Sequence, residues 1–284
     1  MQKGIIRRLN KELPKELYDM ETYFISQAEN NTDFYLNKYK ELSASFNGNY
    51  ICSDLFKETF DEYTQSIENR KLYAEVIHNS AAVLANEMFH EKAASKDIKR
   101  CIFISGVPGA GKSFLIQSLI MSGAIDEDTM IYEGDISSRT IYEKIDVVIN
   151  NNIKPYIMIV NPTLELAQRN AIMRHYEMGR GASCQTMARI LSKIPTALNE
   201  IKERYPNIEL GIYNKKTNYD IENYVGFENA ELLNHGDYDT VLEELQKLRI
   251  EILKEIENDL KKKKLDQIDE VDTKGEIENE TRKR

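Results

Sequence analysis

The chain has 284 residues, of which 41% are hydrophobic and 30% are charged, and its formal net charge is −9. This length and apolar content suffice for one large domain with a buried core. The acidic balance argues against unspecific binding to nucleic acid or to a membrane, because both need a dense positive surface. No apolar run approaches the roughly 20 residues of a membrane span, and the N-terminus lacks the apolar core of a signal peptide. Three cysteines without a CxxC pair are typical of reduced thiols, so we expect a cytoplasmic protein.

The first third of the chain predicts a helical extension followed by one strand and two helical stretches. Residues 1–46 are polar with scattered Tyr and Leu, which indicates one or two helices. The stretch FNGNYIC, residues 46–52, combines a turn signal with a short apolar run and predicts a first strand. SDLFKETFDEY, which follows, is expected to be helical. The apolar spacing from Asn69 to Glu91 predicts a further helix.

The middle of the chain alternates strands and helices. CIFIS, MIYEG, PYIMIV and IELGIYN are the expected strands, the last of them closing the sheet. The helix over NPTLELAQRNAIMRHYE is expected to begin with Asn161 as its cap and Pro162 in its first turn. This alternation predicts an α/β domain over residues 47–237, with a parallel sheet flanked by helices on both faces. Residues 238–284 are expected to form a long charged helix, to about residue 264, and a disordered tail.

One segment predicts a chemistry directly. Residues 106–113, GVPGAGKS, match the pattern GxxxxGK[ST] between an apolar strand and a helix. Glycines are needed there because backbone amides must wrap round a phosphate, and the helix N-terminus adds positive charge. Lys112 is expected to reach the β- and γ-phosphates and Ser113 to hold Mg²⁺. The alternative, a simple glycine-rich turn, is disfavoured by the flanking strand and helix. The expected ATP-binding residues are Gly106, Val107, Pro108, Gly109, Ala110, Gly111, Lys112 and Ser113.

A phosphate loop alone does not define a kinase, which also needs a base and charge-neutralising arginines. Asp54 is the candidate base, because it directly follows a strand at the edge where open α/β sheets bind ligands. Its alternative role is to cap the next helix, and spacing alone favours that role. Arg174 and Arg180, in IMRHYEMGRGAS, lie where P-loop kinases place a mobile lid. Their alternative role is that of solvated helix residues.

Two further groups are candidate substrate contacts. Glu133, at the end of MIYEG, is placed to hold the substrate or a metal-bound water, or else is a strand-end carboxylate in a loop. His78, Asn79 and Ser80 place three polar side chains at the start of an apolar helix. Contact with a substrate and capping of that helix by Asn79 or Ser80 explain them equally well.

Taken together, several segments resemble the zeta toxin family, P-loop kinases of bacterial toxin–antitoxin systems. The resemblance covers roughly residues 48–214 and is carried by SDLFK, VIHNSAAVLA, GVPGAGKS, IYEG and NAIMRHYEMGRGAS…LSKIPTALNEI. In that family the strand with the base follows the phosphate loop, whereas SDLFK precedes it here. Only about 20 residues separate Lys112 from Glu133, too few for the missing strand and helix. The chain therefore resembles a circularly permuted member, and a parallel sheet can still bring the same residues to one cleft.

The resemblance implies an enzyme that uses ATP and Mg²⁺ to phosphorylate a hydroxyl of UDP-N-acetylglucosamine. By matching motif, it implies that Asp54 is the catalytic base, that Lys112 and Ser113 bind ATP and Mg²⁺, and that Arg174 and Arg180 are lid arginines. An antitoxin protein is the partner that the family implies.

The resemblance also implies a site for each of the two nucleotides. Glu133 and Asp135 belong to the sugar-nucleotide site, and Asn214 and Lys215 fall where the family packs its adenine. The family's Glu-Gly-Thr-Gly-Arg differs here, because Asp135 replaces a hydroxyl residue and the arginine is displaced to Arg139. The identity of the acceptor is therefore open.

Two alternatives stand beside this interpretation. One keeps the chemistry and changes the acceptor to another nucleotide or a dinucleotide cofactor. The other is a non-catalytic, nucleotide-dependent binding or switch module whose C-terminal helix engages a partner. Within the kinase interpretation, the N-terminal extension is a candidate built-in inhibitor that covers the active site.

Overall fold

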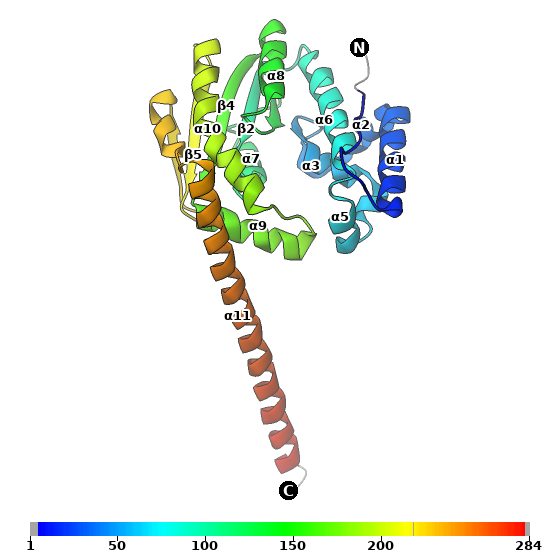
Figure 1. The fold of residues 1–284 in the computed structure, drawn as a ribbon, viewed down its shortest axis with the longest axis vertical. Coiled ribbons are helices and arrows are strands. Elements are labelled where there is room, and N and C mark those ends of the chain that lie inside the picture. The colour runs from blue at the N-terminus through cyan, green and yellow to red at the C-terminus, as the bar shows by residue number, and fades with distance from the viewer. Residues whose placement is uncertain (1–4, 218, 282–284) are drawn as a thin grey trace.

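A computed structural model describes residues 5–217 and 219–281, with side chains described up to residue 259. The N-terminal helices gather on one side of the sheet and a long C-terminal helix projects from the molecule (Figure 1). The elements, in chain order, are α1 (Lys15–Asn30), α2 (Thr32–Glu41), η1 (Ser43–Ser45), β1 (Tyr50–Cys52), α3 (Ser53–Phe56), η2 (Lys57–Thr59), α4 (Asp61–Thr64), α5 (Ile67–Tyr73), α6 (His78–Ala93), β2 (Arg100–Ser105), α7 (Lys112–Met121), β3 (Thr129–Glu133), α8 (Arg139–Asn150), β4 (Lys154–Pro162), α9 (Leu164–Met178), α10 (Cys184–Arg204), β5 (Glu209–Lys215), β6 (Ile221–Val225), η3 (Phe227–Leu233) and α11 (Tyr238–Thr281).

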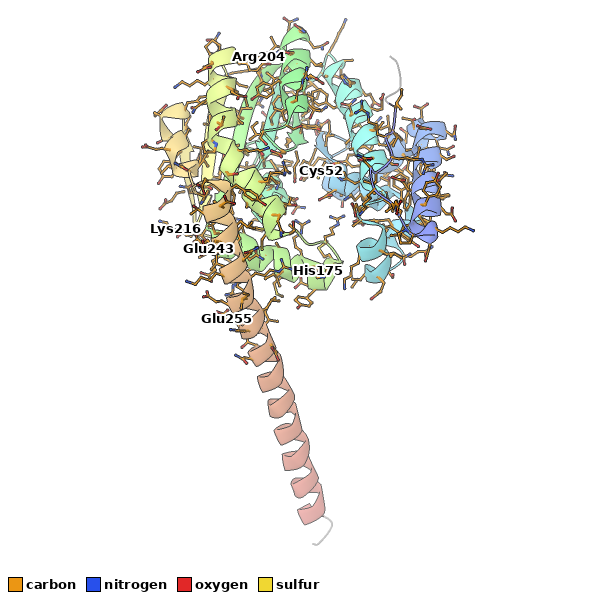
Figure 2. The ribbon with its side chains drawn as sticks, in the orientation of Figure 1. Cys52, His175, Arg204, Lys216, Glu243 and Glu255 are labelled. Carbon is orange, nitrogen blue, oxygen red and sulfur yellow. The ribbon has the colours of Figure 1, made fainter. Side chains whose placement is uncertain are left out.

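The sheet confirms the predicted α/β class. Its six strands have the order β1-β3-β2-β4-β5-β6, and all pairs are parallel except β5 with β6. The register sets Cys52 of β1 and Ile104 of β2 level with Glu133 of β3. Cys52 is buried in the middle of the molecule (Figure 2). The carboxyl ends of β1, β2 and β3 therefore meet at one edge of the sheet, although β1 comes first in the chain.

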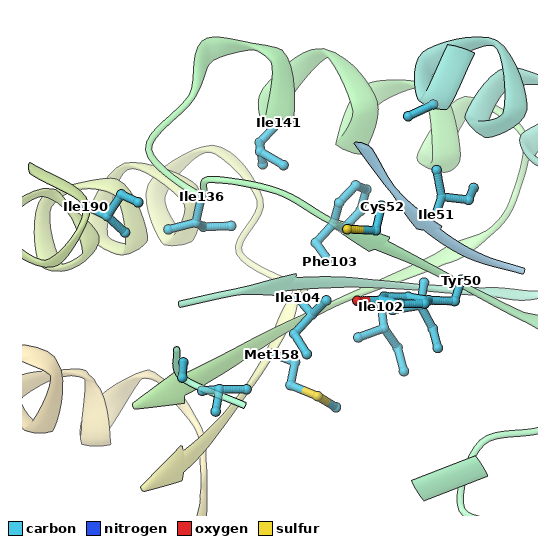
Figure 3. Packing of buried hydrophobic residues seen from close by; sticks show 14 of the residues in the cluster. Tyr50, Ile51, Cys52, Ile102, Phe103, Ile104, Ile136, Ile141, Met158 and Ile190 are labelled. Atoms are coloured by element: carbon cyan, nitrogen blue, oxygen red, sulfur yellow. The ribbon is translucent and has the colours of Figure 1, made fainter. Parts of the chain in front are cut away.

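The central strand β2 is buried on both faces, which explains its continuous apolar sequence. Phe103 points to one side of the strand, and Ile102 and Ile104 point to the other (Figure 3). Ile141 of α8 and Ile190 of α10 lie on the Phe103 side. Because parallel crossovers are right-handed, the connection from β2 back to β3 runs on the opposite face, where α7 lies.

Tyr39 of α2 completes the hydrogen bonding of the edge strand β1. Its hydroxyl donates to the carbonyl of Tyr50 (2.7 Å) and accepts from the amide of Cys52 (3.0 Å). Its ring stacks on Phe56, with centroids 3.6 Å apart. The N-terminal helices thus share one hydrophobic core with the sheet. They lie beside β1, and the segment after α2 contributes Ala44 and Phe46 to the wall of the cavity described below.

Three local predictions were wrong. The predicted helix from Asn69 to Glu91 is two helices, because α5 contacts α9 whereas α6 packs against α3 and β1, and the chain turns between them. Asn161 and Pro162 do not start a helix but end β4, in register with β5, and the Thr163 hydroxyl caps α9 by accepting from the amide of Leu166 (3.3 Å). The sheet also continues beyond β5 into the antiparallel strand β6.

The C-terminal helix α11 is anchored by its first half. Val241, Leu245 and Ile252 are buried, and Glu255 accepts from Arg169 of α9 at 2.7 Å (Figure 2). We expected a disordered tail after about residue 264. In the structure, the helical backbone of α11 instead continues to Thr281. Proline is absent from this stretch of sequence and it contains a single glycine, so no strong helix breaker interrupts it. No described helix is long and apolar enough to cross a membrane.

The double hydrogen bond of Tyr39 generates a stability prediction. Tyr39→Phe keeps the ring stack but leaves the carbonyl of Tyr50 and the amide of Cys52 without this partner. We expect the free energy of unfolding in urea to fall by about 1–3 kcal/mol. Tyr176→Phe is the matched control, because Tyr176 is 54% exposed, and it should change stability by less than about 0.5 kcal/mol. Equal stabilities of the two variants would contradict the role given to the Tyr39 hydroxyl.

Candidate functional site

The glycine-rich loop between β2 and α7 has the geometry of a phosphate cradle. Gly106 and Gly109 have φ angles of +140° and +86°. A Cβ on Gly106 would lie 2.4 Å from the carbonyl oxygen of Val160, and one on Gly109 would lie 2.3 Å from that of Ala167. Only glycine fits these positions, so the loop can lie close against β4 and α9. Asn170 of α9 fastens the loop by donating its amide to the carbonyl of Gly109 (2.9 Å).

Lys112 folds back across its own loop in this structure. Its ammonium donates to the carbonyls of Gly106 (2.8 Å) and Val107 (3.1 Å), and lies 3.4 Å from the Glu133 carboxylate. The two carbonyls are neutral acceptors for a cation that is largely buried. A polyphosphate bound in the loop would offer the ammonium a stronger one.

Tyr50 joins the end of β3 to the first turn of α7. Its hydroxyl donates to the Glu133 carboxylate and lies 3.2 Å from the hydroxyl of Ser113. Burial, followed by the charge of Glu133, raises the pKa of Tyr50 well above its ordinary value, so the phenol stays protonated. Ser113 and Glu133 therefore both contact the hydroxyl of Tyr50.

Ser113 and Glu133 fit a magnesium ion of the kind bound by nucleotides. Such an ion takes one or two protein oxygens and fills its remaining positions with phosphate oxygens and water. Among the residues that the structure describes, no group of three or more His, Cys, Asp and Glu side chains is able to hold a metal by itself. A metal held jointly with a phosphate chain does not require such a group.

Asp54 reaches the same edge from β1 and is paired with Lys57. Its carboxylate lies 2.9 Å from the Lys57 ammonium, one helical turn further on. Desolvation raises the pKa of Asp54, but Lys57, then Arg180 and His78, together outweigh it and lower the pKa to about 2. Asp54 is thus ionised, as a proton acceptor must be. Lys57 has to loosen before the carboxylate becomes a stronger base.

Arg180 is fastened to the β1 side of the site. It pairs with Glu58 and also donates to the backbone carbonyl of Asp54 (3.3 Å). The second oxygen of Glu58 accepts from Arg70 at 2.8 Å. Gly179, at φ +71°, lets the chain turn after α9, where a Cβ would meet the carbonyl of Ile67 at 2.7 Å. The segment that carries Arg180 is therefore closed onto α3–α5.

These groups share one cavity of about 510 Å³ at the carboxyl edge of the sheet. This volume is within the range of small-molecule sites. Four separate stretches of chain contribute the predicted residues to it. Its lining includes Asp54, Pro108, Gly109, Gly111, Lys112, Ser113, Glu133, Arg174 and Arg180, together with Phe46, Tyr50, Phe114, Asn170 and Tyr219.

Apart from Gly106, Val107 and Ala110 of the phosphate loop, four predicted site residues do not line this cavity. Asp135 lies in a turn, where it accepts from Ser137 and pairs with Arg189 at 3.1 Å. The Asn214 side chain accepts from Asn161 (2.8 Å) beside η3. Ser80 is fully buried, without a hydrogen-bond partner for its hydroxyl among the described residues.

The fourth, His78, is exposed but lies near Asp54 and Lys57. Desolvation and the charge of Lys57 lower the pKa of His78, while Asp54 raises it. Asn79, its neighbour, neither lines the cavity nor caps α6, and its side chain donates to the backbone of Arg7 (2.7 Å).

Three residues of the site, Lys57, Tyr50 and Asn170, were not identified from the sequence. The i, i+3 spacing of Asp54 and Lys57 on a helical turn was the one available signal for their pairing. Tyr50 and Asn170 carry no such signal, because their roles depend on which elements pack together.

The comparisons with known proteins add no family. No protein-family model matches the chain, and no curated protein matches it significantly. The motifs and the geometry of the site therefore carry the functional argument.

The pairing of Asp54 with Lys57 generates a titration prediction. In Lys57→Met the largest opposing charge is gone, so desolvation should bring the pKa of Asp54 from about 2 to about 4 or above. Carbon-13 NMR of the carboxylate as a function of pH measures this. The control is Lys38→Met, which removes the partner of the exposed Asp61.

The same shift has a consequence for acid stability. Since the pKa of Asp54 is lower in the folded state, its ionised form stabilises the fold above about pH 4, and this contribution is lost as the pH falls toward 2. Lys57→Met should lack this acid-dependent loss. A pKa that stays near 2 in the variant would assign the shift to Arg180 and His78 instead.

Proposed function

We propose that the protein is an ATP-dependent kinase that phosphorylates a hydroxyl group of a sugar nucleotide, with UDP-N-acetylglucosamine as the expected acceptor. The observation that carries this proposal is the cavity at the sheet edge. A phosphate loop, a carboxylate from β1, a second carboxylate from β3 and two lid arginines meet there. A phosphate-binding turn with no further role does not require the two carboxylates and the two arginines beside it.

Lys112 and the loop amides would hold the phosphate chain, with Lys112 exchanging its loop carbonyls for phosphate oxygens. Ser113 and Glu133 would hold Mg²⁺, which supplies charge neutralisation to the phosphates. Tyr50 then keeps these two oxygens in place through its hydroxyl.

Asp54 would orient the acceptor hydroxyl and take its proton. The acceptor oxygen would bond to the γ-phosphorus of ATP while the bond from that phosphorus to the β,γ-bridging oxygen breaks, and ADP would leave. Since the transition state of phosphoryl transfer is loose, the bond from the acceptor oxygen to phosphorus is barely formed there, so the hydroxyl proton becomes acidic late and a weak base suffices. Arg180 and Arg174 would neutralise charge on the transferred group. In the structure Arg180 pairs with Glu58, so part of this constellation assembles only when substrate competes for that arginine.

The biological part of the proposal rests on the resemblance to zeta toxins. It makes the protein a toxin that depletes a cell-wall precursor in the bacterial cytoplasm and is countered by an antitoxin protein. The N-terminal helices pack beside β1, and the segment that follows them supplies Ala44 and Phe46 to the cavity wall, which favours a structural contribution over a removable inhibitor.

Mass spectrometry of UDP-N-acetylglucosamine incubated with the protein, ATP and Mg²⁺ tests the chemistry. We expect a product heavier by one phosphate, formed about 10²- to 10⁴-fold more slowly by Asp54→Asn, which loses the base but keeps ATP binding. Asp126→Asn, an exposed carboxylate paired with Arg100, is the matched control and should keep full activity. A phosphorylated product formed equally fast by Asp54→Asn would remove Asp54 from the mechanism. If the protein phosphorylates other nucleotides but not UDP-N-acetylglucosamine, the kinase proposal stands with a different acceptor.

Growth of a bacterial host tests the toxin assignment. Overexpression of the wild-type chain should arrest growth, and Lys112→Ala should restore it, because the variant loses the cation of the phosphate site. If soluble, folded Lys112→Ala still arrests growth, the proposed link between phosphoryl transfer and toxicity is contradicted. A nucleotide-dependent binding module would instead keep its effect in Asp54→Asn.

A further inference from the structure

Lys215, the last residue of β5, is a buried charge without a counter-charge. Its relative exposure is 1%, and its ammonium has no hydrogen-bond partner in the part of the chain that the structure describes. The ammonium lies over the ring of Phe114, whose centroid is 5.7 Å away. A cation–π contact at this distance compensates only a small part of the lost hydration.

The ammonium lies against the phosphate loop. A Cβ built on Gly111 would be 2.4 Å from Nζ of Lys215. Gly111 directly precedes α7, and both Gly111 and Phe114 line the cavity. Lys215 therefore lies beside the first turn of a ten-residue helix. It is next to two residues of the cavity lining, Gly111 and Phe114, although it is not itself a lining residue.

This position is electrostatically unfavourable for a cation. The N-terminus of a helix carries a partial positive charge, so a lysine there is repelled rather than attracted. Lys112 adds a second ammonium at the same helix end. Burial lowers the pKa of Lys215, because the charged form loses its hydration. A bound anion would relieve the repulsion and supply the missing hydrogen-bond acceptors.

We infer that Lys215 is a second cation of the phosphate site and binds the phosphate chain of the nucleotide together with Lys112. This inference rests on the proposed function, because it needs a nucleotide in the loop. It differs from the adenine contact that the zeta toxin resemblance implies for this position. Asn214, its neighbour, is occupied with Asn161, so the two residues of this pair have separate roles.

Calorimetric titration of Lys215→Met with ATP, inorganic tripolyphosphate and adenosine tests the inference. Loss of a charged hydrogen-bond donor should weaken ATP and tripolyphosphate about 10- to 100-fold, and adenosine not at all. Lys215→Arg keeps the charge and should recover part of the affinity. Lys216→Met is the matched control, because Lys216 is exposed and paired with Glu222 (Figure 2), and it should bind all three ligands like the wild type.

Thermal unfolding separates a binding role from a structural one. Without ligand, Lys215→Met should be at least as stable as the wild type, because methionine removes an uncompensated buried charge. With saturating ATP, the variant should gain less in Tm than the wild type. A lower Tm without ligand combined with unchanged affinity for tripolyphosphate would overturn the inference. An equal loss of affinity for adenosine would also overturn it, in favour of the base contact.

The two proposals fail in different ways. If Lys112→Ala and Lys215→Met both leave ATP binding intact, the loop is not the nucleotide site and both proposals fall. If both variants lose tripolyphosphate affinity but the wild type transfers no phosphate to any acceptor, the kinase proposal fails and the role of Lys215 stands.

Discussion

The parallel pairing of β1 with β3 is the constraint on which the rest of the site depends. It sets Cys52 level with Glu133, and so carries Asp54 to the edge where β2 opens into the phosphate loop. Nothing in the chain order requires this, because β1 precedes the loop and is joined to β2 by a long helical connection. The pairing is secured from both sides, by β3 on one and by the hydroxyl of Tyr39 on the other. Loss of the pairing with β3, or of the Tyr39 hydroxyl, would shift the Asp54 carboxylate relative to the phosphate loop.

The charged groups of the site are almost all satisfied by protein partners in the structure. Lys112 is held by loop carbonyls, Asp54 by Lys57, and Arg180 by Glu58. Each must exchange that partner for a ligand atom, which lowers the net binding energy that any single contact contributes. The ammonium of Lys215, in contrast, has no hydrogen-bond partner among the described residues that it would have to give up. Its contact with a phosphate would therefore add to the affinity for the nucleotide, because no hydrogen bond of the ammonium to the protein has to be broken first.

The features that could be predicted from the sequence are those that local sequence patterns determine. The strands around the loop, the loop itself and the placement of Asp54 at a carboxyl edge all follow from apolar runs and from the geometry of parallel sheets. What it could not predict depends on contacts between distant segments. Asp135 was expected at the acceptor site, but Arg189 of α10 holds it elsewhere. Lys215 reaches Gly111 only because β5 lies beside β4 in one particular register. The boundary at Thr163 was missed because strand pairing, rather than the Asn-Pro signal, decided where β4 ends.

The chain order also determines when the site can first exist during synthesis. The ribosome delivers the N-terminal helices and β1 before any other strand, and β1 then has a side-chain partner in Tyr39 but no neighbouring strand. Its pairing waits until β3 emerges, after the phosphate loop and α7. A nascent or prematurely ended chain that stops before Glu133 therefore carries both the loop and Asp54 but cannot bring them together. Messages truncated before this point would direct the synthesis of products that lack the assembled site, whatever the activity of the full-length chain.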